Sequence, residues 1–579
     1  SKIKSRWSTN RPADWRRADA SSLEALIQYL DDIFGAGTLH QTSTFFNMIA
    51  PALAVIGLKL NMNKTQIICD GGASNEAVRA CFPDIPESNF FDWTSWTLLG
   101  SPVGSSDAAA QQFAAAVAER ASRKARTIGE IIKRETHVGT ALLKYCAGAP
   151  LINHLARSTG SVIEDQIKMV DESLSKTWQD TVFTLPPLQL QLAQTPVSVG
   201  GLGLRRLAPT CGIAYITAER EARVHQPSLL IDTVRTALPE DPRLRASLAH
   251  ASLCLDPDAF EKLQTYSASS GEKIKHGQSH FTKDHNAAIS QALWDAAPPE
   301  LRVRISSACA PYASSWLAPF PSDESQPVWM HNNAFEALLR LRLGLPLTFA
   351  AAVDEVHECG LCLQHRRDAF GHHALACSNS GAKWRVHNAI RDKIFWLAAE
   401  ALWSPKLEAN VFPGAPRKRA DVAFSVPFGD RRQLFTVDVA VTSPFQASAM
   451  AEFNRSQWLP GCIAQRYERT KYVTYGTLAA TAGFDFVPLV TDSFGAFSPT
   501  AMPLLKRLAF AFGKREGIPA HQAPQKVIGS IVQLLAREIG RTLTASISGS
   551  RRPVRTTAPE RQSEEDEEEG EREEERSEE

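Results

Sequence analysis

The segment CGLCLQHRRDAFGHHALAC, residues 359–377, restricts the fold more than any other part of the 579-residue chain. Cys359 and Cys362 are separated by two residues, and a histidine pair, His372 and His373, precedes Cys377. Thiolate and imidazole groups at this spacing are the ligands of closed tetrahedral Zn²⁺ sites. The pattern therefore predicts that the loop closes around one zinc ion. Either histidine has a usable spacing to Cys377, and three buried cysteines without a metal are the alternative.

A second constraint is an acidic pair, Asp31 and Asp32, inside the apolar stretch IQYLDDIF at residues 27–34. A buried strand normally excludes carboxylates, because an unpaired charge loses its hydration. Apolar residues on both sides, with glycines following, predict two strands with the carboxylates at the turn between them. Such a pair suits Mg²⁺, which prefers oxygen ligands. A polar surface turn is the alternative.

Two further aspartates interrupt apolar strands in the last third of the chain. Asp421 stands in RKRADVAFSV (417–426) and Asp438 in QLFTVDVAVTSP (433–444), two stretches with β-branched alternation joined by a turn. A helix, a glycine stop and a third strand are expected to follow. Two carboxylates on neighbouring strands can bind one divalent ion. The alternative interpretation is that both aspartates are surface charges on edge strands.

Charge divides the chain into a mildly basic body and an acidic run. The whole chain has 63 basic and 63 acidic residues, but residues 561–579 contain 12 acidic residues and 3 arginines. Residues 1–560 therefore carry a net charge of +9, which suits a polyanionic partner, and the acidic run is expected to be disordered. No stretch reaches the roughly 20 apolar residues of a membrane span, and residues 1–20, which are basic and lack an apolar core, are not expected to act as a secretory signal. Apart from the three in the zinc segment, the ten cysteines are scattered, as expected for reduced thiols in an intracellular protein.

The order of YLDD (29–32), GLKLNMNKT (57–65) and LLGSPVG (98–104) resembles the palm of reverse transcriptases from non-LTR retrotransposons. The resemblance implies that Asp31 and Asp32 hold part of a two-metal Mg²⁺ site for nucleotide addition. It also implies that Lys64 protonates the leaving pyrophosphate, although a solvated lysine after a turn is equally compatible. The family's upstream palm aspartate and its fingers have no counterpart. We therefore expect a polymerase truncated at its N-terminus that does not extend primers.

Helical patterns follow over residues 105–350, as in the thumb and connector of the same family. SVGGLGLRRL (198–207) resembles the recurrent GGLGL turn of that family. One helix is basic, and it either grips the backbone of a template–primer duplex or is a solvated charged face. The basic residues are Lys124, Arg126, Lys133 and Arg134.

The last third resembles the zinc knuckle and the PD-(D/E)xK restriction-like endonuclease of site-specific non-LTR elements. The knuckle's FG-x-HAL-x-C form favours His373 over His372 as the ligand. The resemblance implies that Asp421 and Asp438 bind Mg²⁺, although RAD replaces the family's Pro-Asp. Ala440 stands where a classical catalytic lysine would, and Lys471, with Tyr475 one helical turn later, matches the lysine that this family carries on the following helix. Glu408 and His387 are either accessory groups or structural residues.

Together these patterns predict an α+β multidomain protein. The expected parts are a partial palm (1–104), a helical thumb (105–210), a helical connector (211–350), a zinc knuckle (355–380), an endonuclease (383–515), a helical segment (516–550) and a disordered tail (551–579). Family members nick target DNA and extend the nick on element RNA, which implies RNA and DNA as partners, Mg²⁺ and Zn²⁺ as cofactors, and no membrane. The expected location is the nucleus, otherwise the cytoplasm. A non-catalytic nucleic-acid-binding remnant and a free-standing endonuclease are the rival hypotheses.

Overall fold

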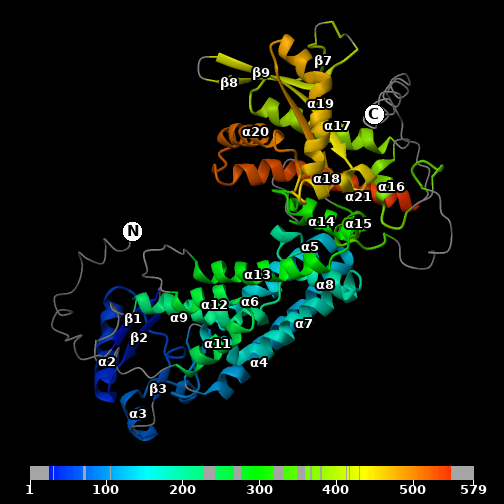
Figure 1. The fold of residues 1–579 in the computed structure, drawn as a ribbon. Helices are drawn as coiled ribbons and strands as arrows, with labels where there is room; N and C mark the ends of the chain where they lie inside the picture. Colours follow the sequence, from blue (N-terminus) through cyan, green and yellow to red (C-terminus); the bar gives the residue numbers. More distant parts are fainter. Residues whose placement is uncertain are drawn as a thin grey trace. The chain divides into compact units, whose positions relative to one another are not determined.

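The computed structural model describes residues 25–548, except residues 30–31, 70–73, 99, 105, 226–240, 267–275, 319–329, 348–358, 366–367, 378–380, 413, 416 and 429–430. The chain forms two compact units. Unit 1 comprises Ser1–Ile305 with Leu317–Pro319, and unit 2 comprises Ser306–Trp316 with Phe320–Glu579. Helices predominate and small sheets accompany them, so the protein is of the α+β class, as the sequence predicts (Figure 1). The boundary divides the range 211–350, which we expected to form one connector.

Unit 1 opens with small β elements. Strands β1 and β2 pair in antiparallel fashion, β3 pairs in parallel with β4, and β5 pairs in antiparallel fashion with β6. These elements and the short helices among them are β1 (Ala25–Tyr29), β2 (Asp32–Ala36), α2 (Leu39–Val55), β3 (Ile67–Cys69), α3 (Asn75–Cys81), η3 (Glu87–Asn89), β4 (Phe90–Asp92), β5 (Trp96–Leu98) and β6 (Ser101–Val103).

The remainder of unit 1 is helical. Its elements are α4 (Asp107–Arg134), α5 (Thr136–Leu142), the π-helical turn η4 (Leu143–Ala147), α6 (Ala149–Thr159), η5 (Gly160–Ile163), α7 (Glu164–Thr181), α8 (Pro187–Gln194), η6 (Val197–Val199), η7 (Ala208–Thr210), α9 (Cys211–His225), α11 (Pro242–Ser252), α12 (Pro257–Thr265) and α13 (Gly277–Ala296). Helix α14 (Pro299–Ala308) contains the boundary between the units.

The long helix α4 organises the core of unit 1. Ser106 caps its first turn by accepting a hydrogen bond from the Ala109 amide, and an alanine stripe buries one face against α6 and α7. On α7, the buried Asp171 accepts amide hydrogen bonds of 2.9 Å from Leu207 and Ala208, which closes the GGLGL turn onto the helix. Burial raises the pKa of Asp171 to about 6, although these amides act in the opposite direction. The turn is therefore held against α7 by two hydrogen bonds to a buried carboxyl group.

Unit 2 is built around one four-stranded sheet in the order β10-β9-β8-β7. Strands β9 and β10 are parallel, and the other neighbours are antiparallel. The strands are β7 (Lys406–Ala409), β8 (Ala420–Phe428), β9 (Arg431–Thr442) and β10 (Asp485–Asp492). The helical elements are η9 (Ser315–Leu317), α15 (Asn332–Leu343), α16 (His372–Ala376), α17 (Ala382–Glu400), α18 (Ala447–Arg455), α19 (Cys462–Thr481), α20 (Ala501–Arg515) and α21 (Ala523–Ser548).

Helices α17 and α19 pack against the sheet, and α21 packs against α15, α17 and α20 (Figure 1). Because β9 and β10 are parallel, the chain must cross back over the sheet between them, and α18 and α19 form that crossover. The predicted β-hairpin and third strand correspond to β8, β9 and β10. Strand β7, which no sequence pattern predicted, extends the sheet on the side of β8.

Candidate functional site

The antiparallel ladder of β8 and β9 brings Asp421 and Asp438 together. Its last regular pair is Val422 with Val437, and the two aspartates are the next residue on each strand. The Val439 amide donates a 2.6 Å hydrogen bond to Asp421 Oδ2, so the Asp421 carboxylate lies against the backbone of β9. Both side chains are largely buried, at 14% and 11% exposure. Two carboxylates that are 17 positions apart in the sequence therefore share one small region of the sheet.

Lys471 reaches this region from α19. Its Nζ lies 3.3 Å from Asp438 Oδ2, and the lysine side chain is 23% exposed. Burial raises the pKa of Asp438 to about 6 and outweighs the opposing effect of the Lys471 ammonium. Burial alone would lower the pKa of Lys471, but the charge of Asp438 raises it above its ordinary value. The lysine therefore stays charged at neutral pH.

The position two residues after Asp438 cannot supply the lysine. Ala440 is buried, and it packs with Ala464 of α19 and Val490 of β10 in a small apolar cluster. A long charged side chain at this position would enter the interface between the helix and the sheet. Helix α19 provides the cation instead.

His387 on α17 contacts the other carboxylate. Its Nε2 lies 3.0 Å from Asp421 Oδ2, and its Nδ1 lies 3.1 Å from Asn388 Oδ1. Burial lowers the pKa of His387, but the hydrogen bond and charge of Asp421 outweigh it, so the net shift is upward. One helical turn later, Arg391 forms an ion pair with Glu408 on β7. Helix α17 thus presents a basic side chain to each of two acidic strand residues.

Tyr475 connects Lys471 with the loop before β8. The Lys471 ammonium lies 5.7 Å from the Tyr475 ring centroid, and the Lys418 ammonium lies 5.4 Å from the same centroid. Cations near an aromatic ring are attracted by its quadrupole. Lys418 stands three residues before Asp421, so the RKR loop at residues 417–419 borders the carboxylates.

The donor set of this region suits a hard divalent cation. Asp421 and Asp438 offer carboxylate oxygens, which Mg²⁺ prefers. Asp438 Oδ2 is buried, and its counter-charge is the Lys471 ammonium at 3.3 Å. An ion pair of this kind offsets the cost of burying a carboxylate. The two carboxylates could hold a divalent cation only if it replaces or joins Lys471 as the positive charge at Asp438.

The zinc segment forms a second candidate centre. Cys359, Cys362, His373 and Cys377 each place one donor atom within 4.8 Å of the others. This cluster can hold a metal ion, and its donor set is compatible with zinc. His372 points elsewhere, because its ring stacks on Phe445 at a centroid distance of 4.0 Å. The structure thus assigns His373 rather than His372 to the cluster.

Electrostatics favour a thiolate at Cys362. Burial opposes ionisation, but the Gln364 amide and hydrogen bonds with His373 and His365 lower the pKa of Cys362 to about 5. The sulfur lies 3.4 Å from His373 Nε2 and 3.6 Å from His365 Nδ1. Because the thiolate is the form that binds metals, the lowered pKa of Cys362 favours binding of a metal cation by the cluster. His365 lies beside it as a neighbour outside the four-residue group.

The short helix α16 aims His373 at the cluster. Asp368 accepts hydrogen bonds from the His372 amide at 2.8 Å and from the His373 amide at 2.7 Å, which satisfies the first amides of the helix. Gly371 precedes the helix with φ +78°, and a Cβ there would lie 2.6 Å from Leu347 Cδ1 and 2.7 Å from Leu543 Cδ2. Any other residue would have to adopt this positive φ and displace the ends of both leucines, so the position favours glycine.

Of the three residues predicted for the polymerase centre, the structure describes the side chain of Lys64 alone. Asp31 lies outside the described residues, and Asp32 begins β2, opposite Tyr29, with its side chain undescribed. Lys64 is exposed in a turn after α2. The four basic residues of the predicted nucleic-acid-binding helix are all exposed on α4, where Lys133 pairs with Glu130 at 2.7 Å.

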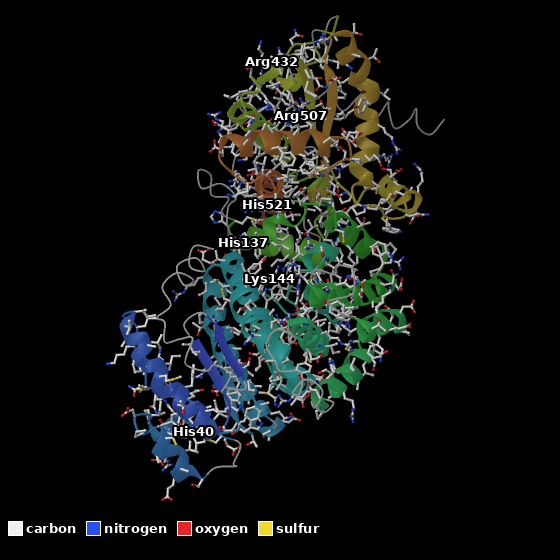
Figure 2. The ribbon with its side chains drawn as sticks, turned by 90° about the vertical axis from the view of Figure 1, so that its left-hand side faces the viewer. His40, His137, Lys144, Arg432, Arg507 and His521 are labelled. Carbon is white, nitrogen blue, oxygen red and sulfur yellow. The ribbon has the colours of Figure 1, made fainter. Side chains whose placement is uncertain are left out.

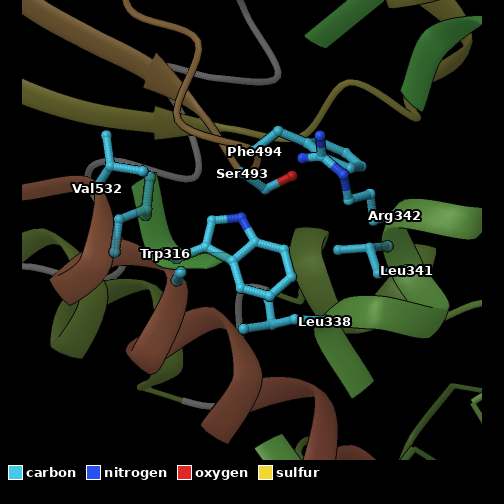
Figure 3. A pocket seen from close by; sticks show the side chains of 9 residues that line it. Trp316, Leu338, Leu341, Arg342, Ser493, Phe494 and Val532 are labelled. Carbon is cyan, nitrogen blue, oxygen red and sulfur yellow. The ribbon is translucent and has the colours of Figure 1, made fainter. Parts of the chain in front are cut away.

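Another cavity lies in the core of unit 2 (Figure 3). Trp316, Leu338, Phe494 and Val532 line it together with the fully buried Arg342. Burial lowers the pKa of Arg342 to about 10, and its guanidinium donates a 2.8 Å hydrogen bond to Ser314 Oγ. The cavity has a volume of about 10 Å³ for the centre of a water molecule, so it can hold about one water. This cavity is therefore a packing feature and too small for a substrate.

Sequence patterns did not identify several supporting residues. Two of them, Arg391 and Lys418, contact residues that are distant in the sequence. The third, Asp368, accepts amide hydrogen bonds that depend on the geometry of its loop. The helical spacing of His387 and Arg391, four residues apart, was the one available signal that both lie on the same face of α17.

A scan against protein-family models matched none, and no curated protein matches the chain. Across the residues that the structure describes, every helix is too short or too polar to cross a lipid bilayer.

Proposed function

We propose that unit 2 is a metal-dependent DNA endonuclease of the restriction-like type, belonging to a non-LTR retrotransposon polyprotein. One observation carries this proposal: Asp421, Asp438 and Lys471 lie together although they come from two strands and a crossover helix. A carboxylate with a raised pKa, here Asp438, beside a buried lysine is typical of catalytic sites. The cysteine–histidine cluster in the same unit is the second part of the family pattern, and we assign zinc to it.

Each residue has a role that its contacts support. Asp421 and Asp438 would hold Mg²⁺, which supplies Lewis-acid charge at a phosphoryl oxygen and lowers the pKa of bound water. Lys471 keeps its proton and stabilises negative charge that develops on the phosphodiester, or orients the attacking water. His387 orients the Asp421 carboxylate through the 3.0 Å contact.

The polymerase part of the proposal has less support. Strands β1 and β2 pair in antiparallel fashion, which is compatible with the hairpin expected of a reverse transcriptase palm. RNA and target DNA are the partners that the whole family pattern requires. The basic α4 and the exposed cations near the nuclease site are compatible with phosphate backbones.

The test is nicking of supercoiled plasmid by the purified chain. We expect nicks with Mg²⁺, none without a divalent ion, and none with Ca²⁺, which occupies oxygen sites with a looser geometry. DNA binding without nicking under any of these conditions would instead favour the non-catalytic remnant. Primer extension on RNA by the same preparation is not expected.

A further inference from the structure

Several cations around the candidate nuclease site have no acidic partner. Lys383 and Arg419 are exposed, and Lys418 is half-buried beside Tyr475. None of the three forms an ion pair with an acid in the part of the chain that the structure describes. We call Lys383, Lys418 and Arg419 the cationic rim.

Three nearby arginines share a single acidic partner. Glu538 on α21 is buried and lies within ion-pair distance of Arg385 on α17 and of Arg537 and Arg541 on α21, so this group is only partly compensated. The rim and these arginines together give this part of unit 2 an excess of positive charge. Such a surface attracts a polyanion.

Helix α21 leads the chain to this surface. Near its end, Thr542 Oγ1 accepts a 3.2 Å hydrogen bond from Arg385, which stands two residues after Lys383 and two before His387. The Ser546 carbonyl accepts a 3.1 Å hydrogen bond from the Gly360 amide. The last turns of α21 therefore lie against the first turns of α17, next to the candidate site.

The sequence after α21 supplies a polyanion of matching charge. Residues 564–579, EEDEEEGEREEERSEE, contain 12 acidic residues and 2 arginines. Residues 549–563 connect this run to α21, and an extended chain of that length can span up to about 50 Å. A tethered segment also has an effective concentration in the millimolar range, so weak contacts suffice for docking.

We propose that residues 564–579 dock on the cationic rim of the same chain and compete there with a nucleic-acid backbone. The inference rests on the proposed function only in that the rim borders the nuclease site. Docking itself requires no catalysis. Because the contacts are between solvated charges, docking weakens as salt rises.

The first experiment compares the full chain with a full-length variant in which the acidic residues of 564–579 are replaced by Gln or Asn. Binding to a labelled duplex is measured by fluorescence anisotropy at low and high salt. We expect the neutralised variant to bind roughly 3- to 30-fold more tightly at low salt and equally at high salt. Equal affinity at low salt would overturn the proposal.

The second experiment locates the docking surface. A labelled peptide of residues 561–579 is titrated into the neutralised full-length variant, with or without Lys383→Gln, Lys418→Gln and Arg419→Gln. We expect peptide binding at low salt that unlabelled DNA displaces and that the three substitutions remove. Unchanged binding to the triple variant would overturn the proposal.

Arg432 provides the matched control for charge loss. Arg432, which Figure 2 labels, stands at the opposite end of the β8–β9 hairpin, roughly 20 Å along the strands from Asp421. Its guanidinium donates hydrogen bonds to Ser425 Oγ and to the Ser425 carbonyl. Arg432→Gln should leave peptide binding intact, and a loss as large as that of the triple variant would contradict docking at the rim. A chain that binds the peptide at the rim but never nicks DNA would refute the proposed function alone.

Discussion

Lys471 Nζ lies 3.3 Å from Asp438 Oδ2, and this ion pair joins residues that are 33 positions apart in the sequence. The pair occupies a largely buried region in which Asp421 is the neighbouring carboxylate. In the structure the lysine ammonium is the counter-charge of Asp438. Under the proposed function, a divalent cation would take over that part, and Lys471 would be free to face the phosphate.

Replacing Lys471 should reduce catalysis without reducing DNA affinity. We expect Lys471→Met to lower the single-turnover nicking rate by roughly 100-fold or more, because a preorganised charge is lost at the reacting phosphate. Lys418→Met is the matched control, since Lys418 lies beside the same Tyr475 ring. This control should weaken DNA binding and leave the rate at saturating protein within a few fold. Equal loss of rate in both variants would contradict a specific role for Lys471.

Asp438 should make the stability of the Mg²⁺-free protein depend on pH. Its pKa in the folded protein is raised to about 6, so between pH 4 and pH 6 the folded state binds more protons than the unfolded state. The folded state therefore loses stability as pH rises through this window. We expect the stability of the wild-type protein relative to Asp438→Asn to increase from pH 7 to pH 5, measured by urea denaturation. A relative decrease would show that the carboxylate is stabilised as an anion.

The metal cluster should depend on His373 and not on His372. His373→Ala removes one of four converging donors and is expected to reduce the zinc content of the purified chain, measured by elemental analysis. His372→Ala removes only the ring that stacks on Phe445, so about one zinc per chain should remain. Loss of zinc in the second variant alone would reverse the assignment.

Gly371 should be intolerant of a side chain. Gly371→Ala forces a β-carbon against Leu347 and Leu543 at a positive φ, and we expect a loss of about 2–4 kcal/mol of unfolding free energy. Gly381→Ala is the control, because Gly381 also has a positive φ (+64°) but no atom lies within 4 Å of its ideal Cβ. The Gly381→Ala variant should lose only about 1 kcal/mol of unfolding free energy. Equal losses, measured by denaturant titration, would show that the clash relaxes without cost.

The sequence predicted those features that depend on local patterns. Alternation of β-branched residues located β8, β9 and β10, and cysteine–histidine spacing located the metal cluster. Strand β7 was missed because KLEA is short and has positive φ at Glu408, so pairing with β8 decides its conformation. The contacts of Arg391 and Lys418 were also missed, because they depend on how α17 and the RKR loop pack against the sheet. The family resemblance already favoured His373 over His372, but the physical reason, the stacking of His372 on Phe445, involves a residue 73 positions away in the sequence.

The most direct test of the nuclease centre is the nicking rate of Asp438→Asn, measured with Mg²⁺ at saturating protein. The substitution keeps the size of the side chain and removes the charge that would hold a cation. We expect the rate to fall by at least roughly 1,000-fold, as when a metal ligand of a catalytic site is lost, with DNA affinity changed less than about threefold. Nicking at the wild-type rate by Asp438→Asn would show that this carboxylate is not part of a nuclease centre.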